Sequence, residues 1–218
     1  MLENHRLNEL ILRFPTDVQL IFKNMIMAYQ LGYVDYVYQA DQVATQNRRI
    51  RNLIKSFRNM DYFYVMPLSQ DLALEIATEW KYPAPYDFYD ATADPEDYAE
   101  LVSEEARGDH FFAVIRNGAL MGYFCVFPTG TSLELGLGMK PSYTGQGNGR
   151  AFYQTIEDYL RNNYEEKIIE LSVAAFNERA QHLYEQCGFK EIGRYIQETN
   201  GGQYPFIKMK KVVKDEIG

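Results

Sequence analysis

Residues 136–160 read GLGMKPSYTGQGNGRAFYQTIEDYL. Gly145, Gly147 and Gly149 alternate with polar residues, at the point where an apolar run is followed by a segment with helical spacing. Glycine weakens strands and helices, by about 1 kcal/mol in a helix interior. Some requirement at this junction between a strand and a helix must therefore outweigh that cost.

Anion binding is one such requirement. The first N–H groups of a helix have no partner within the helix, and the peptide dipoles add about half a positive charge there. Glycine lets a phosphate approach these groups without meeting a Cβ. Neither a Rossmann fingerprint nor a P-loop matches, because position 150 is Arg and the loop ends in Gly-Arg-Ala. The loop alone leaves open a glycine-rich turn without a ligand.

The composition is that of a globular protein, with 46% hydrophobic and 24% charged residues in 218. No apolar run approaches the roughly 18 residues of a membrane helix, and the first ten residues do not resemble a signal peptide. Two cysteines, Cys125 and Cys187, favour a reducing compartment. We therefore expect a cytoplasmic protein that is not bound to a membrane.

The net charge of −8 is unevenly distributed. Residues 1–60 carry +3 and the remainder −11. Such an acidic body disfavours nucleic-acid binding and attracts cations. The three histidines, His5, His110 and His182, are far apart and show no metal-ligand spacing, so no metal site is expected.

Residues 1–60 are expected to form a helical extension. Apolar residues recur at spacings of three and four in 7–14 and 18–33, and 41–57 form a more polar helix rich in arginine. The stretch 15–17 separates the first two helices. Burial of the apolar positions requires packing on the remainder of the chain or across a homodimer contact, and both alternatives stay open.

Residues 61–218 are expected to form one α/β domain. The pattern predicts a strand at 62–68, a helix at 69–80 capped by Ser69, and a hairpin around Asn117-Gly118. A strand at 132–139, a helix at 147–162, a strand at 167–173 and a helix at 177–187 follow. A second hairpin turns at residues 200–202.

The segment LSVAAFNERAQHLYEQCGF, residues 171–189, places Asn177 at the end of a strand and Tyr184 two helical turns further on. Together with the glycine loop, this segment resembles the GNAT superfamily of acyl-CoA-dependent N-acetyltransferases. The match is to the family's strand–loop–helix motif and to its N-x-x-A-x-x-L-Y-x-x-x-G-F pattern. Thr144 stands where the family has Gln or Arg.

The resemblance implies a mixed, mostly antiparallel sheet flanked by helices and splayed between the fourth and fifth strands. It also implies that acetyl-CoA or coenzyme A binds, with Leu137 and Met139 on the pantetheine arm and Asn177 on its far side. The pyrophosphate would lie on the backbone amides of the loop, namely Thr144, Gly145, Gln146, Gly147, Asn148 and Gly149.

For catalysis, the resemblance implies direct attack of an amine on the acetyl thioester. Tyr184 would protonate the leaving thiolate and the Met139 amide would bind the oxyanion. Glu134 shares a strand face with Gly136 and Gly138 and is the expected base, through water. A partly exposed strand carboxylate without a catalytic role is the alternative for Glu134.

The acceptor is expected to be a small-molecule or peptide amine. Eight carboxylates and no Lys or Arg lie between Asp87 and Glu105, beside several aromatic residues. This pattern favours a cationic amine, with Asp87 and Asp90 as its expected contacts. A solvated acidic loop is the alternative. The rival function is a catalytically idle acyl-CoA-binding GNAT domain, a sensor or scaffold whose N-terminal helices bind a partner.

Overall fold

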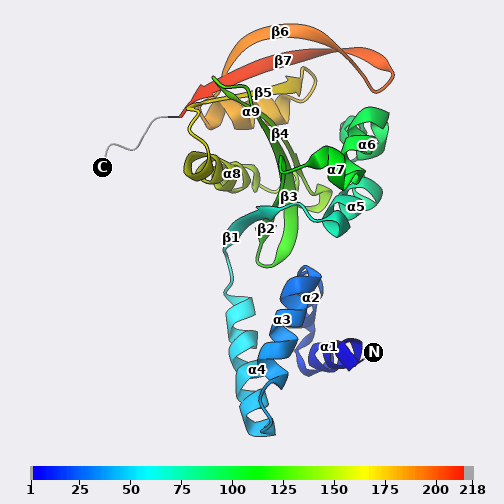
Figure 1. Ribbon diagram of the computed structural model, residues 1–218, viewed down its shortest axis with the longest axis vertical. Helices are drawn as coiled ribbons and strands as arrows, with labels where there is room; N and C mark the ends of the chain where they lie inside the picture. Colours follow the sequence, from blue (N-terminus) through cyan, green and yellow to red (C-terminus); the bar gives the residue numbers. More distant parts are fainter. Residues whose placement is uncertain (1, 214–218) are drawn as a thin grey trace, which may run out of the picture. The chain divides into compact units, whose positions relative to one another are not determined.

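The computed structural model describes residues 2–213, which form two compact units (Figure 1). One unit comprises Met1–Tyr64 with Ile115–Leu120, and the other comprises Val65–Val114 with Met121–Gly218. No helix among residues 2–213 is long and apolar enough to cross a membrane.

The first unit is built from four helices: α1 (Leu2–Arg13), α2 (Thr16–Lys23), α3 (Met27–Tyr38) and α4 (Val43–Arg58). Each helix contributes apolar residues at helical spacing to one core, because only a stripe with that period faces the other helices throughout. The core residues are Leu7, Leu10, Phe14, Val18, Phe22, Met25, Val34, Val37, Ile50, Leu53 and Phe57.

The single helix expected over 18–33 is wrong, because the chain breaks between α2 and α3. Met25 pairs with Ala119 in an isolated antiparallel bridge, and the N–H of Ile26 donates to the Gly118 carbonyl at 2.7 Å. The side-chain amide of Gln30 donates to the Met25 carbonyl at 2.7 Å. These bonds engage backbone groups that a continuous helix would have paired internally.

The second unit carries most of a seven-stranded sheet in the order β1-β2-β3-β4-β5-β7-β6. The strands are β1 (Phe63–Pro67), β2 (Phe111–Arg116), β3 (Ala119–Pro128), β4 (Leu133–Met139), β5 (Ile168–Ala174), β6 (Lys190–Thr199) and β7 (Gly202–Val212). Strand β4 runs antiparallel to β3 and parallel to β5, and β7 runs antiparallel to both β5 and β6.

Strands β4 and β5 pair only at one end. Their register covers Leu133↔Ile169 and Glu134↔Glu170, although β4 continues to Met139. Figure 1 shows the two strands diverging beyond this point. The mixed, mostly antiparallel sheet and the splay between the fourth and fifth strands are both confirmed.

The longer helices of this unit are α5 (Gln70–Glu79), α6 (Pro95–Val102), α8 (Gly149–Asn163) and α9 (Glu178–Gln186). Short helical turns are η1 (Tyr86–Tyr89), η2 (Ala91–Ala93), α7 (Glu104–Arg107) and η3 (Pro141–Tyr143). Ser69 caps α5 by accepting from the Leu72 N–H, as expected. Helix α8 turns Phe152, Tyr153, Ile156 and Leu160 into the core.

Candidate active site

The gap between β4 and β5 opens into a cavity of about 990 Å³. Its wall comes from β4, the glycine loop, the first turns of α8 and α9, and the segment from Tyr82 to Leu101. Clefts of this size, at a break in a sheet, are the usual places for small-molecule sites.

The edge of β4 offers backbone groups to the cavity. Lys140 N–H donates to the Met121 carbonyl at 2.8 Å, which makes 121 and 140 a hydrogen-bonded pair of the β3–β4 ladder. Residues alternate along an antiparallel ladder, so the N–H and C=O groups of Leu137 and Met139 point away from β3. The Met139 carbonyl accepts from the Tyr82 hydroxyl at 2.8 Å, which leaves the Met139 N–H facing the gap.

Two different structural requirements explain why glycine occupies positions 145, 147 and 149. Gly145 and Gly147 adopt φ of 72° and 79°, in the left-handed region that favours glycine. Gly149 has ordinary φ, but a Cβ there would lie 2.8 Å from the Leu183 Cδ2. A Cβ at Gly147 would meet no atom within 4 Å, so the loop leaves open space where the cavity begins.

The loop is held by its own polar side chains. The Thr144 hydroxyl donates to the Pro141 carbonyl, the Gln146 amide to the Ser142 carbonyl and the Asn148 amide to the Tyr143 carbonyl. Across residues 2–213, no acceptor is recorded for the N–H groups of Gly145, Gln146 or Gly147. The loop therefore presents donors without partners beside the positive end of α8.

Two arginines that the sequence analysis did not single out lie at this end of the cavity. The Arg179 guanidinium lies 4.2 Å from the centre of the Tyr86 ring, and its Nη1 would be 3.9 Å from a Cβ at Gly145. Arg150, in the first turn of α8, also lines the wall. Arg150 directly follows Gly149 and Arg179 lies two residues after Asn177. This closeness to predicted site residues is the sequence signal that could have identified them.

Asn177 makes two side-chain hydrogen bonds. Its Oδ1 accepts from the Ala180 N–H at 3.1 Å, which caps α9, while its Nδ2 donates to the Tyr89 hydroxyl at 3.1 Å. The residue is 8% exposed and lines the cavity. It is thus both a helix cap and a link to the segment on the opposite wall.

Tyr184 lines the cavity with a nearly buried side chain. Its ring centre lies 5.7 Å from that of Phe189, which follows the left-handed residue Gly188. Burial raises the pKa of Tyr184, and the neighbouring Tyr89 and Cys187 raise it further. The hydroxyl is therefore protonated at neutral pH.

Most of the predicted site residues meet in this cavity. Those in its wall are Leu137, Met139, Thr144, Gly145, Gly147, Asn148, Gly149, Asn177 and Tyr184. Gln146 and Glu134 do not line it. Glu134 is exposed and pairs with Glu170, before β4 and β5 separate.

Four carboxylates of the segment 86–102 line the cavity, and two are engaged. Asp90 accepts from the Tyr82 N–H at 2.9 Å and pairs with Lys81 at 3.2 Å. Asp94 caps α6 and accepts from Thr199 and Asn200. Asp87, which we expected to contact the acceptor, is exposed and outside the wall.

The other two carboxylates, Asp97 and Glu100, lie one turn apart on α6. No hydrogen bond or ion pair to either carboxylate is recorded within the part of the chain that the structure describes. Burial raises the pKa of Asp97, followed by the charges of Asp94 and Glu96. Burial also raises the pKa of Glu100, and Asp97 raises it further although His110 opposes this.

Two side chains of β3, Tyr123 and Cys125, also line the cavity. Burial raises the pKa of Tyr123, and it raises the pKa of the Cys125 thiol to about 12. The charge of Asp97 contributes to both shifts. The end of the cavity near α6 therefore carries the negative charge of Asp97, which is exposed, and of Glu100, which is half-buried, and the loop end carries Arg150 and Arg179.

Comparison with known proteins agrees with this geometry. The model of the acetyltransferase (GNAT) family matches residues 74–189, more than half of the chain. A curated relative is the spermidine N(1)-acetyltransferase of Vibrio cholerae serotype O1, 31% identical over 86 residues, or 39% of this chain. The match spans half of that relative's length.

Solved structures share the fold at low identity. A chimeric spermidine N-acetyltransferase SpeG from Vibrio cholerae and hSSAT has a TM-score of 0.54 and 22% identity, over 69% of this chain and 95% of the other. A GNAT-family acetyltransferase from Bacillus anthracis has a TM-score of 0.54 and 14% identity, over 71% and 96%.

Proposed function

The chain belongs to the GNAT acetyltransferase family, and we propose that it transfers the acetyl group of acetyl-CoA to a primary amine by direct attack on the thioester. The observation that carries this proposal is that one cavity has a positively charged end and a negatively charged end. Unpartnered amides and two arginines lie at one end, and two unpaired carboxylates lie at the other.

The residues present fit acetyl-CoA. The left-handed glycines leave the loop amides open, the start of α8 favours an anion, and Arg179 and Arg150 add positive charge. The free edge of β4 at Leu137 and Met139 suits an extended amide-bearing chain, which would bond to it as an added strand does. Acetyl-CoA would supply the activated acetyl group.

Two groups of this chain would assist the transfer. The Met139 N–H would donate to the carbonyl oxygen on which negative charge develops, since its strand partner is absent at the splay. The Tyr184 hydroxyl, kept protonated by burial, would give its proton to the departing sulfur.

The acceptor amine must lose a proton before it attacks. Glu134, the base expected from the sequence, lies outside the cavity wall, so we assign this role to Asp97 and Glu100. Both carboxylates line the cavity and have raised pKa values, which brings them closer to the pH at which a base works best.

The same carboxylates indicate a cationic acceptor. An ammonium ion entering the pocket near α6 would make charge–charge contacts with both carboxylates, which face it from one helix. The spermidine N(1)-acetyltransferase among the relatives supports a polyamine-like acceptor. The acidic balance of residues 61–218 would draw such a cation to the surface.

A turnover screen tests this proposal. Purified protein is incubated with acetyl-CoA and spermidine, spermine, putrescine, a neutral primary amine or an acidic amino acid. Acetylated product is measured by mass, because the two free cysteines, Cys125 and Cys187, would interfere with thiol reagents. We expect turnover with the polyamines. Binding of acetyl-CoA without turnover of any amine would favour the catalytically idle domain instead.

A further inference from the structure

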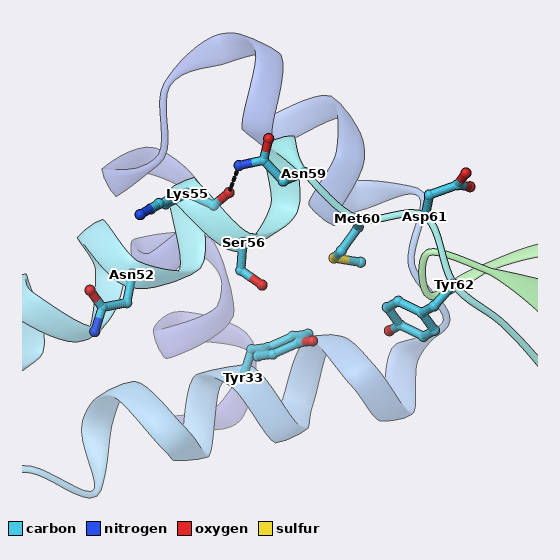
Figure 2. Close-up of a pocket in the computed structure, with 8 residues that line it drawn as sticks. All are labelled: Tyr33, Asn52, Lys55, Ser56, Asn59, Met60, Asp61 and Tyr62. Atoms are coloured by element: carbon cyan, nitrogen blue, oxygen red, sulfur yellow. Dashed lines mark hydrogen bonds between the residues drawn. The ribbon is translucent and has the colours of Figure 1, made fainter.

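The helical unit contains a second hollow, of about 560 Å³, which lies outside the residues matched by the family model. Successive turns at the end of α4 form one side of it through Asn52, Lys55 and Ser56, and Tyr33 of α3 lies opposite Ser56 (Figure 2). The segment after α4 closes the hollow with Met60 and Tyr62.

The wall of this hollow contains one cation, Lys55, and one carboxylate, Asp61. Helix α4 contains no Asp or Glu between Val43 and Arg58. Lys55 is exposed, and no ion pair involving it is recorded among residues 2–213. The one carboxylate in the wall, Asp61, is neutralised by Arg116 at 3.1 Å. Lys55 thus remains as the uncompensated charge, with the exposed Arg51 one turn earlier on the same helix.

Two aromatic rings form another part of the wall, and each packs against a further ring. The Tyr33 ring packs edge-on against Phe57 with centres 4.9 Å apart, and the Tyr62 ring stacks on Tyr64 at 6.3 Å. Tyr62 is still 37% exposed. Burial raises the pKa of Tyr33 and raises that of Tyr62 to about 12, so both hydroxyls stay neutral donors.

Polar donors complete the wall. Ser56 points from α4 toward the ring of Tyr33, and Asn52 lies one turn earlier on the same helix (Figure 2). The Asn59 amide donates to the Lys55 carbonyl at 2.8 Å, which fixes the chain where it leaves the helix. The hollow therefore combines one positive charge, neutral hydrogen-bonding side chains and ring surface, at the size of a small-molecule site.

We propose that this hollow binds a small anion with a planar aromatic body, of the size of a nucleoside monophosphate. The anionic group would lie at Lys55, where a charge-assisted hydrogen bond is strongest. The planar body would lie against the rings of Tyr33 and Tyr62, and its polar edge would bond to Asn52 and Ser56. This site is separate from the acetyl-transfer cavity and does not depend on the function proposed for it.

The test is a titration of the full ¹⁵N-labelled chain with AMP, GMP, UMP, phenyl phosphate and inorganic phosphate. Backbone amide shifts resolve this hollow from the cavity, where a nucleotide also finds arginines. We expect saturable shifts in residues 52–62 with at least one nucleotide, and affinity at least ten-fold weaker for inorganic phosphate. Absence of saturable shifts in 52–62 for all five probes would overturn the proposal.

Matched variants test whether binding depends on the charge of Lys55 and on the open volume beside Ser56. Lys55→Gln should weaken binding about ten-fold, the loss expected for one hydrogen bond to a charged group. Arg48→Gln, which removes one exposed charge from the same helix outside the hollow, should leave the affinity unchanged. Ser56→Phe fills the space and should abolish binding with an unchanged circular dichroism spectrum. Equal effects of Lys55→Gln and Arg48→Gln, or wild-type affinity in Ser56→Phe, would refute the site.

Discussion

The Tyr82 hydroxyl donates a 2.8 Å hydrogen bond to the Met139 carbonyl, across 57 positions of sequence. The bond joins the acidic segment that borders the cavity to the free edge of β4. It occupies the Met139 carbonyl and leaves the N–H of the same residue for a ligand. Burial raises the pKa of Tyr82, so the hydroxyl remains a donor at neutral pH.

Tyr82→Phe should remove this bond from the half-buried Met139 carbonyl. We expect the unfolding free energy to fall by about 0.5–1.5 kcal/mol, the net contribution of one hydrogen bond. The melting temperature should fall by about 2–4 °C per kcal/mol. The KM for acetyl-CoA should rise because the edge of β4 loses its support. Tyr36→Phe, at an exposed position, is the control and should change neither quantity.

Gly147→Ala should lower the affinity for coenzyme A at least ten-fold, measured by calorimetry. The alanine must adopt φ near 79° or move the loop, and its Cβ would enter the space beside the amides. Gly130→Ala is a matched control, because Gly130 has φ of 84° and open space but lies in the β3–β4 turn. Both variants should lose about 1–2 kcal/mol of stability. Equal affinities for coenzyme A would remove the loop from the binding site.

Tyr184→Phe should lower kcat at least ten-fold and leave the affinity for acetyl-CoA nearly unchanged. The variant keeps the packing of the ring on Phe189 and loses only the proton for the departing sulfur. Tyr159→Phe, whose ring packs in the core against Phe112 and Phe124, is the control. A rate for Tyr184→Phe equal to that of the control would favour the catalytically idle domain.

Asp97→Asn and Glu100→Gln should lower kcat/KM for spermidine, and Glu134→Gln should not. In the wild-type enzyme, the acidic limb of kcat/KM against pH should lie above the usual range of carboxyl groups, because burial raises the pKa of both residues. Loss of the acidic limb in Glu134→Gln alone would return the base to Glu134.

The same pKa shift predicts a gain of stability in Asp97→Asn. A carboxyl group whose pKa is higher in the folded state binds more protons there, so the unfolding free energy falls as the pH rises between the unfolded and folded pKa values. Above that window the cost of the charged form is present, and solvent screens part of it because Asp97 is exposed. Asp97→Asn should therefore melt higher than wild type at pH 7 and lose this advantage near pH 3.5. Equal melting temperatures at pH 7 would show that the carboxylate is well solvated.

Local elements of this protein followed directly from the sequence. Asn117-Gly118 and Asn200-Gly201 adopt positive φ in their hairpin turns. Such turns depend on which residues tolerate left-handed backbone, which is a property of a few neighbours. The strand–loop–helix unit around Gly147 was predictable for the same reason.

The proposed assignment of the base to Asp97 and Glu100 depends on tertiary structure. Alternation along β4 indicates which face Glu134 occupies but not where along the strand the cleft begins. The cleft opens only after Glu134, where β4 leaves β5, while Asp97 and Glu100 reach the cavity from a helix far away in sequence. Arg179 was missed because its role depends on the approach of α9 to the loop.

The break between α2 and α3 has the same origin. The periodicity of residues 18–33 is compatible with one helix, and by itself the sequence determined helical structure and an apolar stripe. Only the pairing of Met25 with Ala119, 94 positions further on, decided where the helix stops. Backbone groups bond to whichever partner the fold brings to them, and a partner that is distant in sequence leaves no local pattern.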